Sequence, residues 1–175
     1  MQTIVEELEL GLPQSNGEQR LNWAKTIVHL NIKIADLNAV FLCSSKSKTV
    51  RRYLWLLTDI GSQNPKMLHE SLPQILNEWN QVNVKNKEAS LANYWLVAGI
   101  PIQNEGEAIN LLFKWLISAK TNISAKARSL KLLFELSKKY PEIKKELKLS
   151  LESQLNLQST DFRKKALNIL NKLEI

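Results

Sequence analysis

The chain has 175 residues, of which 44% are hydrophobic and 23% charged, a balance that predicts one globular domain over residues 1–175. Its single cysteine, Cys43, excludes an internal disulfide framework, and only five glycines and five prolines favour long helices with short connections. The net charge of +7 lies wholly in residues 120–175, which hold 13 basic and 6 acidic residues, an asymmetry that bears on partners rather than on fold.

Helical periodicity begins near the N-terminus. Residues 2–12 predict a short acidic helix, and Ser15 with Glu18 resembles a capping box that opens a second helix. Residues 34–43 predict a third, short and apolar helix. Alternating strand patterns are absent from the sequence, so an all-α fold is expected.

The central stretch, residues 47–79, predicts two helices joined by a tight turn at residues 61–65. In the first helix apolar residues recur at i, i+3 and i+4, and Trp55 widens that face, which predicts cover on more than one side. Asn64 suits the N-cap of the second helix and Pro65 its first position. Neither helix can bury its apolar face alone.

The rest of the chain repeats this alternation of periodic segments and breaks. Asn104 with Glu107 is expected to open one helix, and Ser159 or Thr160 to cap the last. About ten helices are expected in all. The later segments are a loop at 80–87 and helices at about 86–99, 104–117, 124–139, 141–155 and 160–173.

The central unit recurs later in the chain. A shift of 76 residues aligns Leu54 with Leu130, Leu56 with Leu132, Leu57 with Leu133 and Pro65 with Pro141. Half of that shift, 38 residues, is close to the period of about 40–47 residues of armadillo and HEAT units.

Two segments, SAKARSLKLLFEL at 124–136 and FRKKALNILNKL at 162–173, resemble HEAT repeats. The resemblance implies an α-solenoid of stacked antiparallel helix pairs whose concave face binds a partner. The C-terminal half also resembles a family of short bacterial helical-repeat proteins that often carry the name adenylosuccinate lyase. The glycine-serine-serine loop and the methionine-proline-tyrosine-lysine signature of those lyases are absent from this sequence, so no catalytic residue can be carried over.

No residue type stands in a pattern that predicts catalysis, a cofactor or a metal. His29 and His69 are 40 positions apart and lack a second metal-spaced ligand. Cys43 has no histidine near it in sequence and reads as a small buried hydrophobe. Phosphate-binding and dinucleotide-binding loops do not occur.

Basic and aromatic residues are the functional lead. Arg52 and Arg128 occupy positions where HEAT units place a bracing arginine, so a structural role is expected for both. The five tryptophans are expected to lie mostly in the core, and any that is exposed beside basic residues could stack on bases. The candidate binding residues form two clusters. Lys144, Lys145 and Lys148 are expected together on the polar side of the 141–155 helix, and Arg163, Lys164 and Lys165 form the second cluster.

Three functions follow as alternatives. The first is a non-enzymatic scaffold for a protein partner, and the second is a nucleic-acid-binding module that uses the basic C-terminal third. The third, a lyase of purine metabolism, has only the shared name behind it. Neither a signal peptide nor an apolar run long enough for a membrane is evident, so a cytoplasmic protein with no membrane partner is expected.

Overall fold

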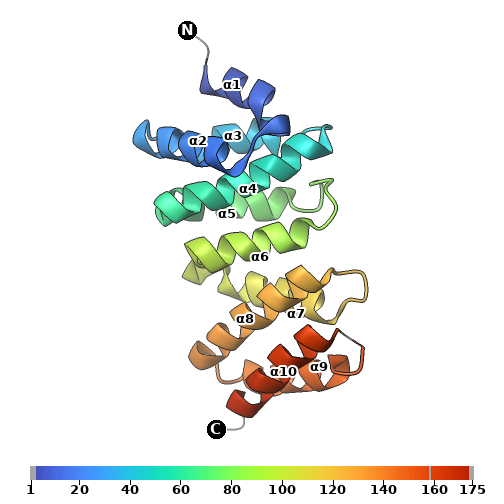
Figure 1. The fold of residues 1–175 in the computed structure, drawn as a ribbon. Coiled ribbons are helices and arrows are strands. Elements are labelled where there is room, and N and C mark those ends of the chain that lie inside the picture. The colour runs from blue at the N-terminus through green and yellow to red at the C-terminus, as the bar shows by residue number, and fades with distance from the viewer. Residues whose placement is uncertain (1–2, 158, 174–175) are drawn as a thin grey trace. The chain divides into compact units, whose positions relative to one another are not determined.

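The structure, a computed structural model, describes residues 3–157 and 159–173. Within them it contains ten α-helices and two short 3-10 helices and no strand, which confirms the all-α prediction (Figure 1). In chain order these elements are α1 (Ile4–Gly11), η1 (Leu12–Gln14), α2 (Gly17–His29), α3 (Ile34–Phe41), α4 (Ser47–Gln63), α5 (Pro65–Glu78), α6 (Lys87–Ala98), η2 (Ile102–Asn104), α7 (Glu105–Ile117), α8 (Ile123–Lys139), α9 (Ile143–Gln154) and α10 (Thr160–Leu173).

The chain divides into two compact units, Met1–Pro101 and Ile102–Ile175. The boundary follows α6, where Gly99 takes a positive φ of 82° and Pro101 cannot donate a backbone hydrogen bond. Each unit has its own buried residues. The expectation of one domain over residues 1–175 stays a prediction.

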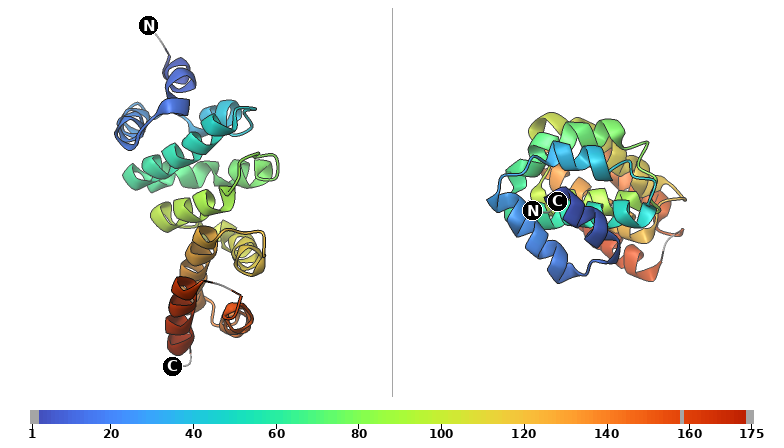
Figure 2. Two further views of the ribbon diagram at one scale, coloured as in Figure 1. Left: turned by 45° about the vertical axis from the view of Figure 1, so that its right-hand side comes forward. Right: turned by 90° about the horizontal axis from the view of Figure 1, so that it is seen from above.

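The first unit is built around α4. This helix packs against α2 and α6 within one layer, and against α3 and α5 in a second layer (Figures 1 and 2). Its eight buried residues span an arc of roughly 160°. Among them Tyr53 is fully buried, and its hydroxyl donates to Asn38 Oδ1 at 2.7 Å. Cover on more than one side is therefore confirmed, since four helices pack against α4, but Trp55, which the periodicity predicts to widen the covered face, is 38% exposed.

The second unit is built around α8. This helix packs against α7, α9 and α10, and its N-cap residue Asn122 accepts a hydrogen bond from the backbone of Ala125 at 2.8 Å. The row Ile143, Leu147 and Leu151 forms the buried face of α9, as the i+4 spacing predicts.

The helices α4 and α8 are equivalent in burial as well as in sequence. Both have 17 residues, and their bounds differ by 76 positions at each end. The same shift carries every buried position of one onto a buried position of the other. The pairs are Thr49 and Ala125, Val50 and Lys126, Tyr53 and Ser129, Leu54 and Leu130, Leu56 and Leu132, Leu57 and Leu133, Ile60 and Leu136, and Gly61 and Ser137.

The predicted turn at residues 61–65 is wrong in extent, because α4 continues to Gln63 and only Asn64 separates it from α5. Gly61 is buried inside the helix. A Cβ atom there would lie 2.6 Å from Leu68 Cδ1 and 3.2 Å from Ala98 Cβ. This glycine therefore allows close packing of α4 on α5 and α6 and does not form a turn.

At three helix starts the capping hydrogen bonds differ from those predicted. The capping box of α2 pairs Asn16 with Gln19, one position later than predicted, while Ser15 is buried and donates to the carbonyl of Leu12 at 2.9 Å. Asn64 and Asn104 occupy N-cap positions without a side-chain hydrogen bond to the helix. At α10, Ser159 Oγ does accept from the backbone of Phe162, as predicted, at 3.4 Å.

Two glycine substitutions test the role of Gly61. Gly61→Ala should lower the free energy of unfolding by about 1–3 kcal/mol, because the added methyl group overpacks the contact with Leu68 and Ala98. Gly106→Ala is the control, since no atom lies within 4 Å of its added Cβ, and it should raise stability by up to about 1 kcal/mol. Urea unfolding followed by circular dichroism measures both, and a Gly61→Ala protein as stable as Gly106→Ala would refute the packing role.

Candidate functional site

The three predicted lysines of α9 lie on one side of that helix. Lys144 and Lys145 are exposed, and Lys148 is half-buried. Helical geometry places the three within an arc of about 100°, away from the buried row. Lys144 and Lys145 have no ion-pair partner within the described parts of the chain, so both ammonium groups are available to an anionic partner.

The three predicted residues of α10, Arg163, Lys164 and Lys165, are all exposed. They lie in the first turns of α10, whereas Lys144 and Lys145 lie in the first turn of α9, and the two helices pack against each other (Figure 1). Lys165 lines a shallow hollow that also contains Asp161, whose carboxylate offsets its charge. The six candidate residues thus lie on two helices, one group on each.

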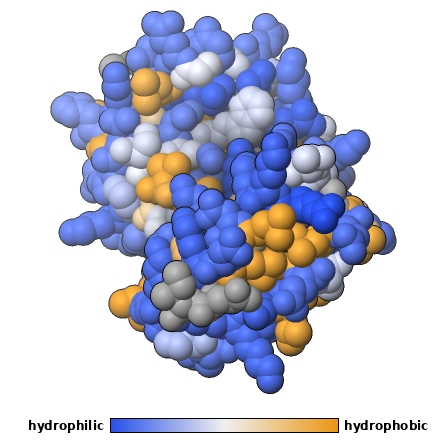
Figure 3. Space-filling model, turned by 60° about the horizontal axis from the view of Figure 1, so that its bottom comes forward, coloured by the Kyte–Doolittle hydropathy of each residue, from blue (hydrophilic) through white to orange (hydrophobic). Residues whose placement is uncertain are grey.

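Exposed hydrophobic side chains are scattered over many elements. Figure 3 shows one face of the molecule, on which hydrophobic areas are set among hydrophilic side chains. The most exposed are Ile102, Leu157, Leu10 and Leu30, which come from distant parts of the sequence. Single exposed apolar residues of this kind are common on protein surfaces and do not by themselves define a binding site.

The tryptophans divide between core and surface. Trp79, Trp95 and Trp115 are buried, which agrees with the core prediction, and Trp23 is half-buried with its indole N–H donating to Glu7 at 2.6 Å. Trp55 is 38% exposed. The guanidinium groups of two arginines lie over its ring.

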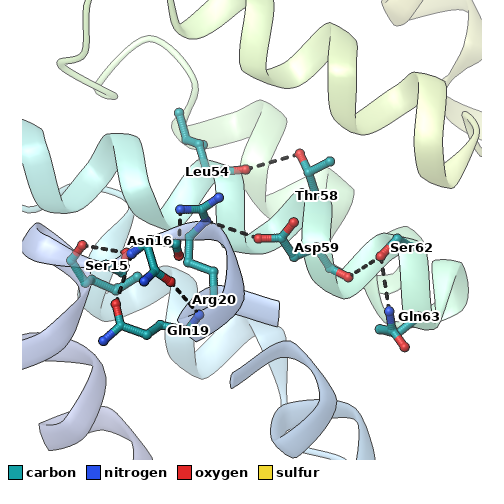
Figure 4. Close-up of polar contacts among 10 residues, drawn as sticks. Ser15, Asn16, Gln19, Arg20, Leu54, Thr58, Asp59, Ser62 and Gln63 are labelled. Atoms are coloured by element: carbon teal, nitrogen blue, oxygen red, sulfur yellow. Dashed lines mark hydrogen bonds and ion pairs between the residues drawn. The ribbon is translucent and has the colours of Figure 1, made fainter. Parts of the chain in front are cut away.

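The surroundings of Trp55 are basic. The carbon Cζ of Arg52 lies 4.6 Å from the ring centroid, and that of Arg20, from α2, lies 5.2 Å away. Arg20 Nε also donates to Asp59 Oδ2 at 3.1 Å and so joins α2 to α4 (Figure 4). Burial raises the pKa of Asp59 more than the Arg20 charge lowers it.

One face of α4 therefore carries a basic and aromatic surface that the prediction of candidate residues missed. We call this surface the α4 stripe and define it as Lys48, Arg51, Arg52 and Trp55, which stand at i, i+3, i+4 and i+7. A sequence signal for it exists, because four basic residues fall within 46–52 and no acidic residue occurs between Asp36 and Asp59.

The histidines and the cysteine are the side chains that could in principle take part in catalysis. His69 Nε2 lies 2.7 Å from the carbonyl oxygen of Ala98, and His29 is exposed on the last turn of α2. Cys43 is exposed, contrary to the prediction of a buried residue, and partial burial and the Glu78 carboxylate raise the pKa of its thiol. Among the described residues no three His, Cys, Asp or Glu side chains gather in a way that could hold a metal ion.

Two buried charges brace the second unit. Glu105 Oε2 accepts from Lys139 Nζ at 2.6 Å and from the Tyr140 hydroxyl at 2.5 Å, which ties the start of α7 to the end of α8. Burial acts to raise the pKa of Glu105, but the two hydrogen bonds and the Lys139 charge together lower it. Lys126, only 2% exposed, donates to Gln154 Oε1 at 3.1 Å, and burial lowers its pKa.

Comparison with known proteins gives one match. A family model described as HEAT repeat domain matches residues 24–173. No curated protein and no solved structure matches the chain. None of the described helices combines the length and apolar character needed to cross a membrane.

The Glu105 brace predicts a pH-dependent contribution to stability. Glu105→Gln should lower the free energy of unfolding at neutral pH by roughly 1–3 kcal/mol, because it weakens the hydrogen bonds from Lys139 and Tyr140. Since folding lowers the pKa of Glu105, this stability is present above the pKa of the unfolded carboxyl and is lost as the pH falls through the folded pKa.

Thermal unfolding from pH 7 down to pH 3 should therefore show the variant and the wild type converge. Glu107→Gln is a matched control on the same turn of α7, where the side chain is exposed. A difference between Glu105→Gln and wild type that stays constant over this range would contradict the ionic character of the brace.

Proposed function

We propose that this chain, which belongs to the HEAT repeat domain family, is a non-enzymatic scaffold that binds a protein partner. The family match over residues 24–173 is the observation that carries the proposal, because helical-repeat proteins present extended surfaces to partners. The surroundings of His69 and Cys43 support it, because His69 Nε2 is hydrogen-bonded to the Ala98 carbonyl and the raised pKa of the Cys43 thiol disfavours the reactive thiolate.

Within this function, Lys144, Lys145 and Lys148 are the residues we assign to contact with the partner, with Arg163, Lys164 and Lys165 as a second contact. Five of the six side chains are exposed, and Lys144 and Lys145 make no ion pair with a described residue, which supports the assignment. Charged groups of this kind raise association rates and select partners more than they add affinity. The partner surface should therefore carry negative charge.

Nucleic acid is the second candidate partner. The net charge of +7 in residues 120–175 favours it, because phosphate backbones attract such a surface without sequence specificity. Phe134 in α8 lies beneath the ammonium groups of Lys138 and Lys172, at 4.8 and 6.0 Å from the ring centroid. One ring covered by two cations is a poor platform for base stacking, which is why the protein partner stands first.

The test compares three proteins in the native host: wild type, Lys144→Glu with Lys145→Glu and Lys148→Glu, and a control with Lys33→Glu, Lys66→Glu and Lys85→Glu. The control residues are exposed and lie in the first unit, and both triple variants change the net charge equally. In-cell cross-linking with mass spectrometry should identify one protein bound to the wild type and the control, and the α9 variant should lose it by about tenfold or more.

Binding of single-stranded and duplex DNA by the same proteins decides the second candidate. We expect weak binding that falls steeply with salt, with a log–log slope near −0.9 per neutralised phosphate. Binding that stays tight at physiological salt and is lost only in the α9 variant would replace the protein partner by nucleic acid. If no protein is cross-linked to any of the three, the scaffold proposal is wrong.

A further inference from the structure

We propose that the α4 stripe is a docking surface for an acidic segment of a partner protein. This inference rests on the proposed function, and it adds the chemistry of one partner segment and a second contact surface in the first unit. The residues that carry it are Lys48, Arg51, Arg52 and Trp55, supported from α2 by Arg20.

The geometry of the stripe follows from the burial of α4. The buried positions of the helix leave the stripe residues on the remaining side, where Lys48, Arg51 and Trp55 are exposed and Arg52 is half-exposed. Residues at i, i+3, i+4 and i+7 fall within about 100° of one another. Their side chains therefore form one surface about 10 Å long, the span of three to four residues of extended peptide.

The charges of the stripe are unbalanced within the protein. The side chains of Lys48, Arg51 and Arg52 make no hydrogen bond or ion pair with any residue in the described parts of the chain. The nearby Asp59 already binds Arg20 at 3.1 Å. Three cations held on one helical face without a carboxylate repel each other, and an acidic partner relieves that repulsion.

The aromatic residue in the stripe favours a protein over a nucleic acid. The ring of Trp55, on which a base would have to stack, already lies beneath the guanidinium groups of Arg20 and Arg52. Single-strand binding by stacking uses successive aromatic side chains, whereas this surface has one. Tryptophan and arginine together are typical of the residues that dominate protein–protein binding energy.

The interactions of Arg20 hold the Trp55 side chain of the α4 stripe in place. Its guanidinium is held by Asp59, by the carbonyl of Asn16 at 3.0 Å and by the Trp55 ring, so the indole is fixed between α2 and α4 before any partner arrives. A pre-ordered anchor loses little conformational freedom on binding. Arg51 and Arg52, which have no such carboxylate, can then bind partner carboxylates in bidentate fashion.

A defined probe tests this inference. A fluorescein-labelled short peptide of alternating glutamate and leucine is titrated with the whole chain, and binding is followed by anisotropy at low and at physiological salt. The same peptide with glutamine in place of glutamate, and an oligothymidine of similar length, are the comparison ligands. Wild type should bind the glutamate peptide and bind both comparison ligands at least about tenfold more weakly.

Four variants separate the stripe from general charge. Arg51→Glu with Arg52→Glu should weaken peptide binding about tenfold or more, and Lys48→Glu with Arg51→Glu should do the same while leaving the Arg52–Trp55 contact in place. Trp55→Ala should weaken binding by a similar factor without changing its salt dependence. Lys66→Glu with Lys85→Glu, exposed in the same unit, changes the net charge equally and should bind as wild type does. Circular dichroism shows whether each variant folds.

Three results would overturn the inference. One is an absence of peptide binding by the wild type at low salt. Another is an equal loss in the Lys66 and Lys85 control, which would reduce the effect to net charge. The third is oligothymidine binding tighter than peptide binding and dependent on the same residues. Because cross-linking tests the protein partner separately, each of these results refutes the docking surface without refuting the proposed function.

Discussion

The eight buried positions along one long helix constrain each unit of this protein. In α4 these positions are filled by Thr49, Val50, Tyr53, Leu54, Leu56, Leu57, Ile60 and Gly61. Burial of this kind is the main favourable term in folding, and here it is shared among neighbours, since α4 contacts α2, α3, α5 and α6. The side of α4 that these neighbours leave uncovered carries the α4 stripe.

The same positions in α8 hold different chemistry. Lys126 stands where α4 has Val50, Ser129 where it has Tyr53, and Ser137 where it has Gly61. A buried ammonium group costs desolvation, which the single bond to Gln154 offsets only in part. The second unit therefore gains less from apolar burial along its central helix, and Glu105 adds a polar brace between α7 and α8.

Periodicity alone predicted the helices, the 76-residue repeat and the buried rows, because these depend on residues close together in sequence. It misread Gly61, since the run GSQNP has the composition of a turn while Leu68 and Ala98, which decide the packing there, lie elsewhere in the sequence. Periodicity also could not predict that Trp55 is exposed. In a helix that is apolar on several sides, only the placement of α2 and α6 determines which side stays open.

For the candidate binding residues too, the local sequence predicted some features, while others depend on residues distant in sequence. Sequence predicted that Lys144, Lys145 and Arg163 would be polar and outward, and the structure agrees on their exposure. The sequence also predicted two groups, one on each helix, but the packing of α10 against α9 depends on contacts between distant residues and could not be predicted from a local pattern. The two surfaces proposed as partner contacts, the α4 stripe and the lysines of α9, are both basic, and this shared charge is the reason that an acidic partner is proposed for each.

Hydrogen exchange measured residue by residue in the native protein tests the central role of the two long helices most directly. We expect the amides of residues 53–60 in α4 to exchange slowest in the first unit, and those of residues 129–136 in α8 to exchange slowest in the second. Because Lys126, Ser129 and Ser137 replace less polar residues, the α8 amides should exchange faster than their α4 equivalents. The helix α1 has only one buried residue, Leu8. If the amides of α4 exchanged as rapidly as those of α1, α4 would not be the central helix of the first unit.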